Sequence, residues 1–166
     1  MTNTVADINF LGAAGGSTVA KDLAFLRRTT NQVLTASTWT AISFDAEDID
    51  AANGHSTTTN TSRYTAVAAG KYRFGGGAYF TYSSGTPTIA AGFRLNGSGT
   101  GNTGYIVGSL TQMKPSTSTG CSIVLPTTLV SLTAGQWVEL IVYCDGTSPQ
   151  IDNSYQPTMS VEWVGV

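Results

Sequence analysis

The clearest hydrophobic pattern of the chain lies in residues 62–82, where two stretches with strand-like alternation flank a turn at Ala69-Gly70. In the second stretch the bulky side chains share one parity, and these residues are Tyr72, Phe74, Ala78, Phe80 and Tyr82. Successive side chains of a β-strand point to opposite faces of its sheet. The pattern therefore predicts a long strand with one face buried in a hydrophobic core.

The opposite parity of this strand carries Gly75, Gly77 and Tyr79, where a strand facing water usually carries long polar side chains. Glycine inside a strand often marks a bulge or the close approach of another backbone. We therefore predict that another copy of the chain packs on this face. Trp163, from the closing strand, is predicted to join the same interface.

Alternation continues along the rest of the body, without a helical period. Turn-rich segments separate further predicted strands, which cover residues 33–44, 89–95, 105–110, 121–132, 136–145 and 158–166. The segment 121–132 reads either as one bulged strand or as two strands, because Pro126 interrupts it. About eight strands at such spacing are typical of a sandwich or jelly roll. We expect residues 33–166 to form an all-β jelly-roll domain.

Residues 1–32 lack this alternation and are interpreted as an N-terminal arm. Ser17 or Thr18 can cap a short helix over residues 19–28, in which Leu23 and Leu26 lie about one turn apart. So short a helix is marginal in isolation. The segment is therefore either an unstructured tail or, as we favour, an attachment arm that binds a larger assembly through Leu23, Phe25 and Leu26.

Charge and composition narrow the classes of partner. Charged residues make up 11% of the 166 residues, against about 25% in an average soluble protein, and the net charge is −2. No basic patch indicates nucleic-acid binding. No run of 18 apolar residues predicts a membrane span, and no secretory signal is recognisable at the N-terminus. Cys121 and Cys144 are interpreted as buried thiols, although the sequence leaves their bonding open.

Catalytic chemistry is not indicated. A hydrolytic triad would require His55, the one histidine of the chain, and that residue lies in the polar segment 51–61. We interpret His55 as an exposed loop residue. We therefore expect neither an enzyme nor a cofactor.

The acidic run Asp45, Glu47, Asp48 and Asp50 is the one weak candidate for a metal site. Ca²⁺ takes oxygen ligands from such clusters, but the spacing does not match an EF-hand loop. Acidic residues at the end of a strand are more often simply solvated. We therefore predict no metal site.

The residues described so far include a family signature. The segment Gly70-Lys71-Tyr72-Arg73-Phe74, with Tyr64 before it and Ser160-Val161-Glu162-Trp163 near the end, resembles C1q/TNF-like trimeric jelly-roll domains. Residues 54–66 are also similar to stretches of virion proteins of tailed bacteriophages, often minor tail or head-decoration proteins. The resemblance implies a homotrimer whose inner sheet includes the first strand, the strand over residues 70–82 and the last strand.

These expectations combine into a functional hypothesis. The chain is expected to be a non-enzymatic structural protein on the surface of a bacteriophage virion, assembled in the host cytoplasm. It would be a trimeric decoration or minor tail protein, anchored to other virion proteins through residues 1–32. The alternative is a module at the tail tip that binds a host receptor or glycan, and a weaker third is a bacterial adhesin. Loops 51–61, 96–104 and 114–120 contain almost no aromatic anchors, which favours the decoration role.

Overall fold

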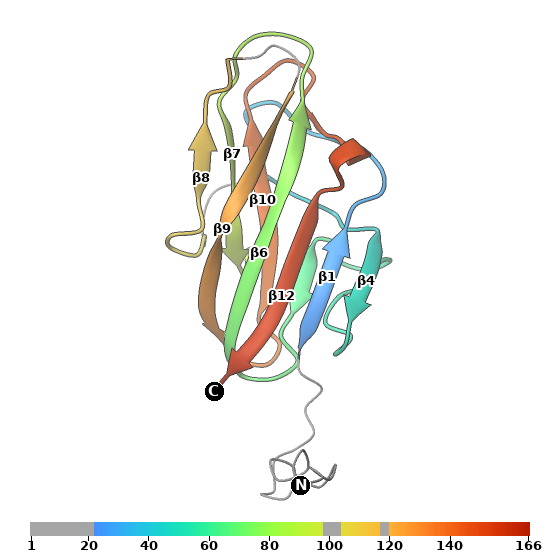
Figure 1. The fold of residues 1–166 in the computed structure, drawn as a ribbon, viewed down its shortest axis with the longest axis vertical. Coiled ribbons are helices and arrows are strands. Elements are labelled where there is room, and N and C mark those ends of the chain that lie inside the picture. Colours follow the sequence, from blue (N-terminus) through green and yellow to red (C-terminus); the bar gives the residue numbers. More distant parts are fainter. Residues whose placement is uncertain (1–21, 98–103, 117–119) are drawn as a thin grey trace, which may run out of the picture.

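Two antiparallel β-sheets pack face to face in the computed structural model, which describes residues 22–97, 104–116 and 120–166 (Figure 1). In these ranges the larger sheet has seven strands: β1 (Leu23–Arg27), β2 (Gln32–Val33), β4 (Ala46–Asp50), β6 (Gly70–Thr81), β9 (Gly120–Leu132), β11 (Gln150–Ile151) and β12 (Thr158–Gly165). The smaller sheet has five: β3 (Thr40–Ala41), β5 (Arg63–Thr65), β7 (Ile89–Leu95), β8 (Thr111–Met113) and β10 (Trp137–Cys144). A short 3-10 helix, η2 (Asn153–Tyr155), precedes β12.

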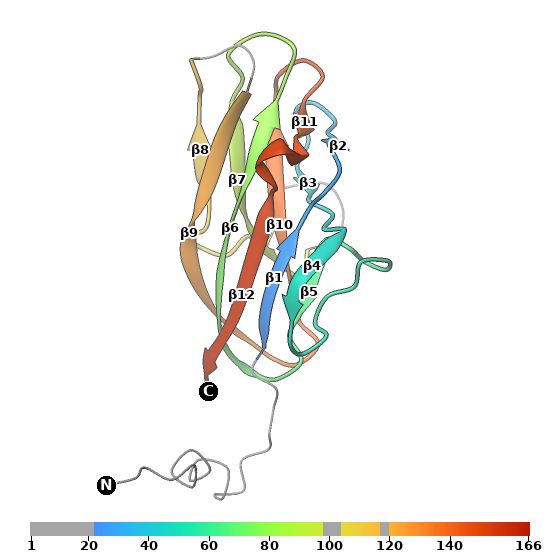
Figure 2. The ribbon, with the colours of Figure 1, turned by 45° about the vertical axis from the view of Figure 1, so that its right-hand side comes forward.

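Strand β6 is the centre of the larger sheet. It pairs with β9 along one side and with β11 and β12 along the other, and β1 lies between β12 and β4 (Figure 1). In the smaller sheet β10 pairs with β7, β3 and β5, and β8 extends the sheet beyond β7 (Figure 2). This arrangement confirms the predicted all-β sandwich.

The core forms where the alternating apolar faces of the two sheets meet. Tyr72, Phe74 and Phe80 of β6 are fully buried, as the alternation predicts. Phe74 contacts Phe93 of the smaller sheet, with ring centroids 5.7 Å apart. Burying an aromatic side chain contributes on the order of 2–3 kcal/mol, so the bulky parity of β6 is a main source of cohesion between the sheets.

The predicted helix over residues 19–28 is wrong where the structure describes it, because Leu23–Arg27 is strand β1. Ala24 and Leu26 are buried while Leu23 and Phe25 are exposed, which is the period of a strand. Five residues cannot sustain a helix alone, whereas β12 and β4 offer backbone partners on both sides. The sandwich therefore includes residues assigned to the arm of residues 1–32. The remainder, residues 1–21, lies outside the described residues.

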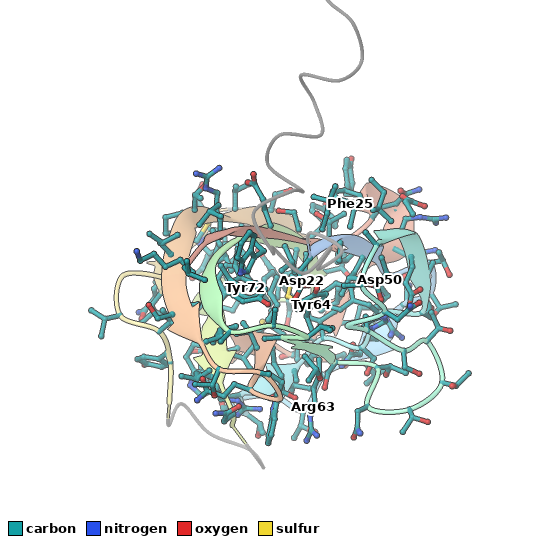
Figure 3. The ribbon with its side chains drawn as sticks, turned by 90° about the horizontal axis from the view of Figure 1, so that it is seen from below. Asp22, Phe25, Asp50, Arg63, Tyr64 and Tyr72 are labelled. Carbon is teal, nitrogen blue, oxygen red and sulfur yellow. The ribbon has the colours of Figure 1, made fainter. Side chains whose placement is uncertain are left out.

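Asp22, directly before β1, connects the start of this strand to the core through hydrogen bonds. Its buried carboxylate accepts hydrogen bonds from the hydroxyl of Tyr72 and, over 3.1 Å, from the backbone N–H of Val67. Its carbonyl accepts from the N–H of Trp163 over 2.7 Å. Figure 3 shows Asp22 beside Tyr64 and Tyr72 between the two layers. Burial, together with the nearby Asp22 carboxylate, raises the pKa of the Tyr64 hydroxyl, so this phenol stays neutral.

Two other predicted strands differ in the structure, and one of the two alternatives for residues 121–132 is selected. The strand predicted over residues 33–44 is divided into β2 and β3 by a turn in which Ser37 has a φ of 60°. Residues 105–110 form an irregular connection rather than a strand, joined to the sheet by a bridge between Tyr105 and Arg94. The segment around Pro126 is one bulged strand, β9, because proline has no N–H to donate to the ladder.

Candidate interaction surfaces

The outer face of the larger sheet, on the side away from the core, has a centre with almost no side chains. Gly75 lies opposite Ser160, which in turn lies opposite Phe25. Gly77 lies opposite Thr158 on one side and Val124 on the other. The middle of this face is consequently a trough, with longer side chains along both borders.

Apolar side chains on both borders of the trough are exposed. On β9, Val124 and Leu129 are 75% and 58% exposed. On the opposite border, Leu23 and Phe25 of β1 and Ile49 of β4 are also exposed, and Figure 3 shows Phe25 on the outer side of the sheet. An exposed apolar patch with polar surroundings is typical of a protein interaction site.

Two hollows occupy the trough. One, of about 340 Å³, lies next to Gly77 and is bordered by Tyr79, Val124 and Tyr155, the rings of the two tyrosines being 4.4 Å apart. The other, of about 180 Å³, lies next to Gly75 beside the exposed ion pair of Arg73 and Glu162. These hollows can receive protruding side chains from another molecule.

The two predicted interface glycines differ in what they do. A Cβ on Gly77 would lie 2.7 Å from the carbonyl oxygen of Ile123, so packing within the chain already requires glycine there. A Cβ on Gly75 would meet only the Ser160 hydroxyl, at 2.9 Å. Gly75 is therefore the glycine whose missing side chain mainly shapes the outer surface.

Trp163 does not lie on this face, contrary to its assignment to the interface. It has the parity of the core residues, opposite Tyr72, and packs against the core. Its Nε1 donates to the carbonyl of Ala69 over 3.3 Å. Gly70 leaves room for the indole, since a Cβ at Gly70 would lie 2.1 Å from Nε1. Leu26 is likewise buried, so of the three predicted attachment residues only Leu23 and Phe25 are accessible.

The acidic run binds parts of its own chain. Asp45 accepts hydrogen bonds from the N–H of Thr29, over 2.6 Å, and from the Thr30 hydroxyl, over 2.7 Å. Partial burial by itself would raise the pKa of Asp45, but these bonds and the charge of Arg28 together hold it below its usual value. Asp48 pairs with Arg27 over 2.8 Å.

The other two carboxylates of the run hold the polar loop after β4. Glu47 contacts His55, and Asp50 accepts from the backbone N–H groups of Gly54 and His55, over 3.0 and 2.9 Å. The four carboxylates thus serve four different sets of partners. Within the described ranges, no group of three or more His, Cys, Asp or Glu side chains is placed to hold a metal ion.

His55 is buried rather than exposed, which corrects the sequence-based interpretation. Its Nδ1 lies 2.7 Å from Oε1 of Glu47 and its Nε2 lies 3.0 Å from the carbonyl oxygen of Thr61. Both partners are acceptors, so a ring nitrogen that carries a proton can donate to its partner. His55 therefore connects β4 to the end of the polar loop, and it packs edge-on against Phe44.

Neither cysteine forms a disulfide. Cys144 is buried in the core, and burial raises the pKa of its thiol. Cys121 is half-buried, with its Sγ 3.3 Å from the sulfur of Met113. Among the described residues, no helix has the length and apolar character needed to cross a membrane.

Comparison with known proteins supports the architecture. No family model matches the chain, and no curated protein matches it either. Among solved structures, the globular domain of zebrafish complement 1qA protein matches with a TM-score of 0.56 and 10% sequence identity, covering 87% of this chain and 97% of that chain. At this identity the likeness concerns the fold alone. The chain has the jelly-roll β-sandwich fold of the C1q globular domain.

Proposed function

We propose that this chain is a non-enzymatic structural module that assembles as a homotrimer through the outer face of its larger sheet, on the surface of a bacteriophage virion. The observation that carries the proposal is the trough at Gly75 and Gly77, with the exposed Val124 and Leu129 along one border. These side chains contribute nothing to the core of a monomer, and burial against another copy would stabilise them by about 25 cal/mol per Å².

The shape of this face supports a ring rather than a two-fold dimer. Val124 and Leu129 protrude furthest, from the β9 border, whereas the hollow beside the Arg73–Glu162 pair is lined mainly by β6 and β12. Knobs and hollows at different positions suit a head-to-tail contact, which closes into a ring when the rotation permits. The resemblance of residues 70–74 to C1q/TNF-like trimers supports three as the number of subunits. An obligate interface of this kind buries on the order of 2,000 Å² or more.

The oligomer is tested with the double variant Val124→Glu and Leu129→Glu. The wild-type chain is expected to sediment at three times the monomer mass at micromolar concentration, and the double variant as a monomer. Unpaired carboxylates buried at each of the three contacts would cost several kcal/mol. Both side chains are more than half exposed in the single chain, so its circular dichroism spectrum should not change.

Val107→Glu is the matched control, because Val107 is 94% exposed but lies in the connection between β7 and β8 of the smaller sheet. This variant should remain trimeric. A wild-type chain that is monomeric at micromolar concentration would refute the proposal. So would a double variant that stays trimeric.

The virion location rests on the resemblance of residues 54–66 to phage virion proteins and on the low content of charged residues. Attachment to other virion proteins is proposed for residues 1–21 rather than for the whole of residues 1–32, because β1 belongs to the sandwich. The proposal covers a head-decoration and a minor tail position alike.

The chain is expected to be a stoichiometric component of phage particles purified from a lysate of its host. Quantitative mass spectrometry of banded particles measures its copy number, which should be a multiple of three. Particles that contain the known capsid and tail proteins but not this chain would contradict the virion assignment. They would leave the trimer to be judged by sedimentation alone.

A further inference from the structure

Three aromatic side chains meet on the outer face of the smaller sheet, on the opposite side of the molecule from the trough. They are Trp39, just before β3, Tyr143 of β10, and Tyr105 of the connection between β7 and β8. The Trp39 ring lies 5.5 Å from that of Tyr143 and 6.3 Å from that of Tyr105. The rings are inclined by 40° and 57° to the Trp39 plane, so they form a concave wall rather than a stack.

The register of the sheet makes a floor for this wall. Ala90 of β7 lies between Tyr143 on one neighbouring strand and Gln112 on the other. A methyl group between two long side chains leaves a depression. The resulting hollow has a volume of about 380 Å³, and Leu110 closes one side of it. Small-molecule sites commonly have volumes of about 300–1,000 Å³.

Polar groups stand beside the aromatic rings. Oδ1 of Asp145 accepts a hydrogen bond from the N–H of Thr88 over 2.7 Å, which orients the carboxylate and leaves Oδ2 for a ligand. The exposed amide of Gln112 offers both a donor and an acceptor. None of the described residues that line the hollow is basic, so the site provides no positive charge to bind a phosphate or sulfate.

We infer that this hollow binds a neutral saccharide of about one or two sugar rings, a size within the range of such sites. The C–H face of a pyranose is apolar and packs on aromatic rings, and Trp39 and Tyr143 present such surfaces. Sugar hydroxyls both donate and accept hydrogen bonds. They therefore match a carboxylate that only accepts and an amide that does both. Rigid aromatic side chains also lose little conformational entropy on binding.

A proline-rich peptide is the other ligand that aromatic-lined grooves bind. Such a peptide presents backbone carbonyls and few N–H groups, so it needs donors from the protein. The Gln112 amide and the tyrosine hydroxyls can supply donors, but Asp145, the one charged residue lining the hollow among the described residues, can only accept and would find few N–H groups on such a peptide. The chemistry of the polar groups therefore favours the saccharide.

This site does not depend on the proposed trimer, because it uses the outer face of the other sheet. It adds ligand recognition to a chain proposed above as a structural module. In the sequence, the small number of aromatic residues in the loops favoured a structural role over ligand binding. The aromatic wall is built instead from β10, the residue before β3 and the connection between β7 and β8.

The test titrates the full-length, ¹⁵N-labelled chain with maltohexaose, chitohexaose, mannohexaose and a galactohexaose, and separately with a decaproline peptide. The indole N–H signals of the three tryptophans, assigned through single Trp→Phe variants, report the site of binding. At least one oligosaccharide is expected to shift the Trp39 signal saturably while leaving that of Trp163 unchanged. Sedimentation of the same samples reports the oligomeric state independently.

Trp39→Ala and Gln112→Ala are each expected to weaken binding by at least about tenfold, a loss of 1.4 kcal/mol. Matched controls are Trp137→Ala, on the same sheet face but beneath the guanidinium of Arg63, and Lys114→Ala, beyond the end of β8. Both controls should bind as the wild type does. Gln112 and Lys114 are exposed, so this pair tests the site even if a tryptophan variant misfolds.

Three results would overturn the inference. The first is that none of the four oligosaccharides shifts the Trp39 signal. The second is that binding survives Gln112→Ala unchanged. The third is that decaproline shifts the Trp39 signal while the oligosaccharides do not, which would make the hollow a peptide site.

Discussion

Removal of residues 1–32 is expected to abolish folding, whereas removal of residues 1–21 is expected to leave a folded sandwich. The longer deletion removes β1 from between β12 and β4, and with it the buried Ala24 and Leu26. Loss of a buried leucine side chain alone costs about 2–5 kcal/mol. The longer deletion also removes Asp22. The buried Tyr72 hydroxyl would then lack its carboxylate acceptor.

These losses add to a total that a typical domain cannot sustain, since its free energy of unfolding is about 5–15 kcal/mol. Urea unfolding and ¹H–¹⁵N spectra of the two truncated chains make the comparison. The matched point variant is Asp22→Ala in the chain that begins at residue 22, which should be destabilised but folded. A cooperative, well-dispersed chain of residues 33–166 would instead restore the boundary expected from the sequence.

Replacing Glu139 by alanine is expected to destabilise the chain by about 3–5 kcal/mol, because it removes one member of a buried ion pair. Nη2 and Nε of Arg94 donate to Oε2 of Glu139 over 2.8 and 3.2 Å, and the two side chains are only 4% and 5% exposed. The Ser62 hydroxyl donates to the other oxygen over 2.8 Å. The variant therefore removes the carboxylate that balances a guanidinium held away from water.

Chemical unfolding at a fixed protein concentration measures this cost, since an oligomer's stability depends on concentration. Asp48→Ala is the matched control: its ion pair with Arg27 also spans 2.8 Å, but its carboxylate is 46% exposed. Such a surface pair contributes at most about 1 kcal/mol. Equal, small losses in both variants would contradict this prediction. Replacing Arg94 and Glu139 together by leucine should recover much of the loss.

The strands and the core were predictable from local sequence wherever apolar residues keep one parity. β6 and β12 satisfy this condition, and their bulky parity is the buried one. The reason is geometric, because a strand has a period of two whatever its neighbours are. The glycine-containing outer face of β6 follows from the same alternation. The fold class was predicted correctly on these grounds.

Contacts between segments far apart in the sequence determined the features that the local pattern did not predict. Leu23, Phe25 and Leu26 place apolar side chains on both parities, so their own pattern does not distinguish a helix from a strand. Pairing with β12, far along the chain, and with β4 selects the strand. His55 lies in a polar segment, so its sequence context predicts an exposed side chain. In the fold, its ring is buried and contacts Glu47 of β4 and the carbonyl of Thr61.

The aromatic hollow could not be predicted from the sequence at all. Trp39, Tyr105 and Tyr143 are far apart in the chain, and no spacing relates them. They meet because β10 pairs in one register with β3 and β7, which places Ala90 beside Tyr143 as a low floor. A sequence determines which residues of a strand share a face, since that depends on neighbours two positions apart. Which strands share a sheet, and therefore which side chains form a site, depends on the free energy of the whole packed sandwich.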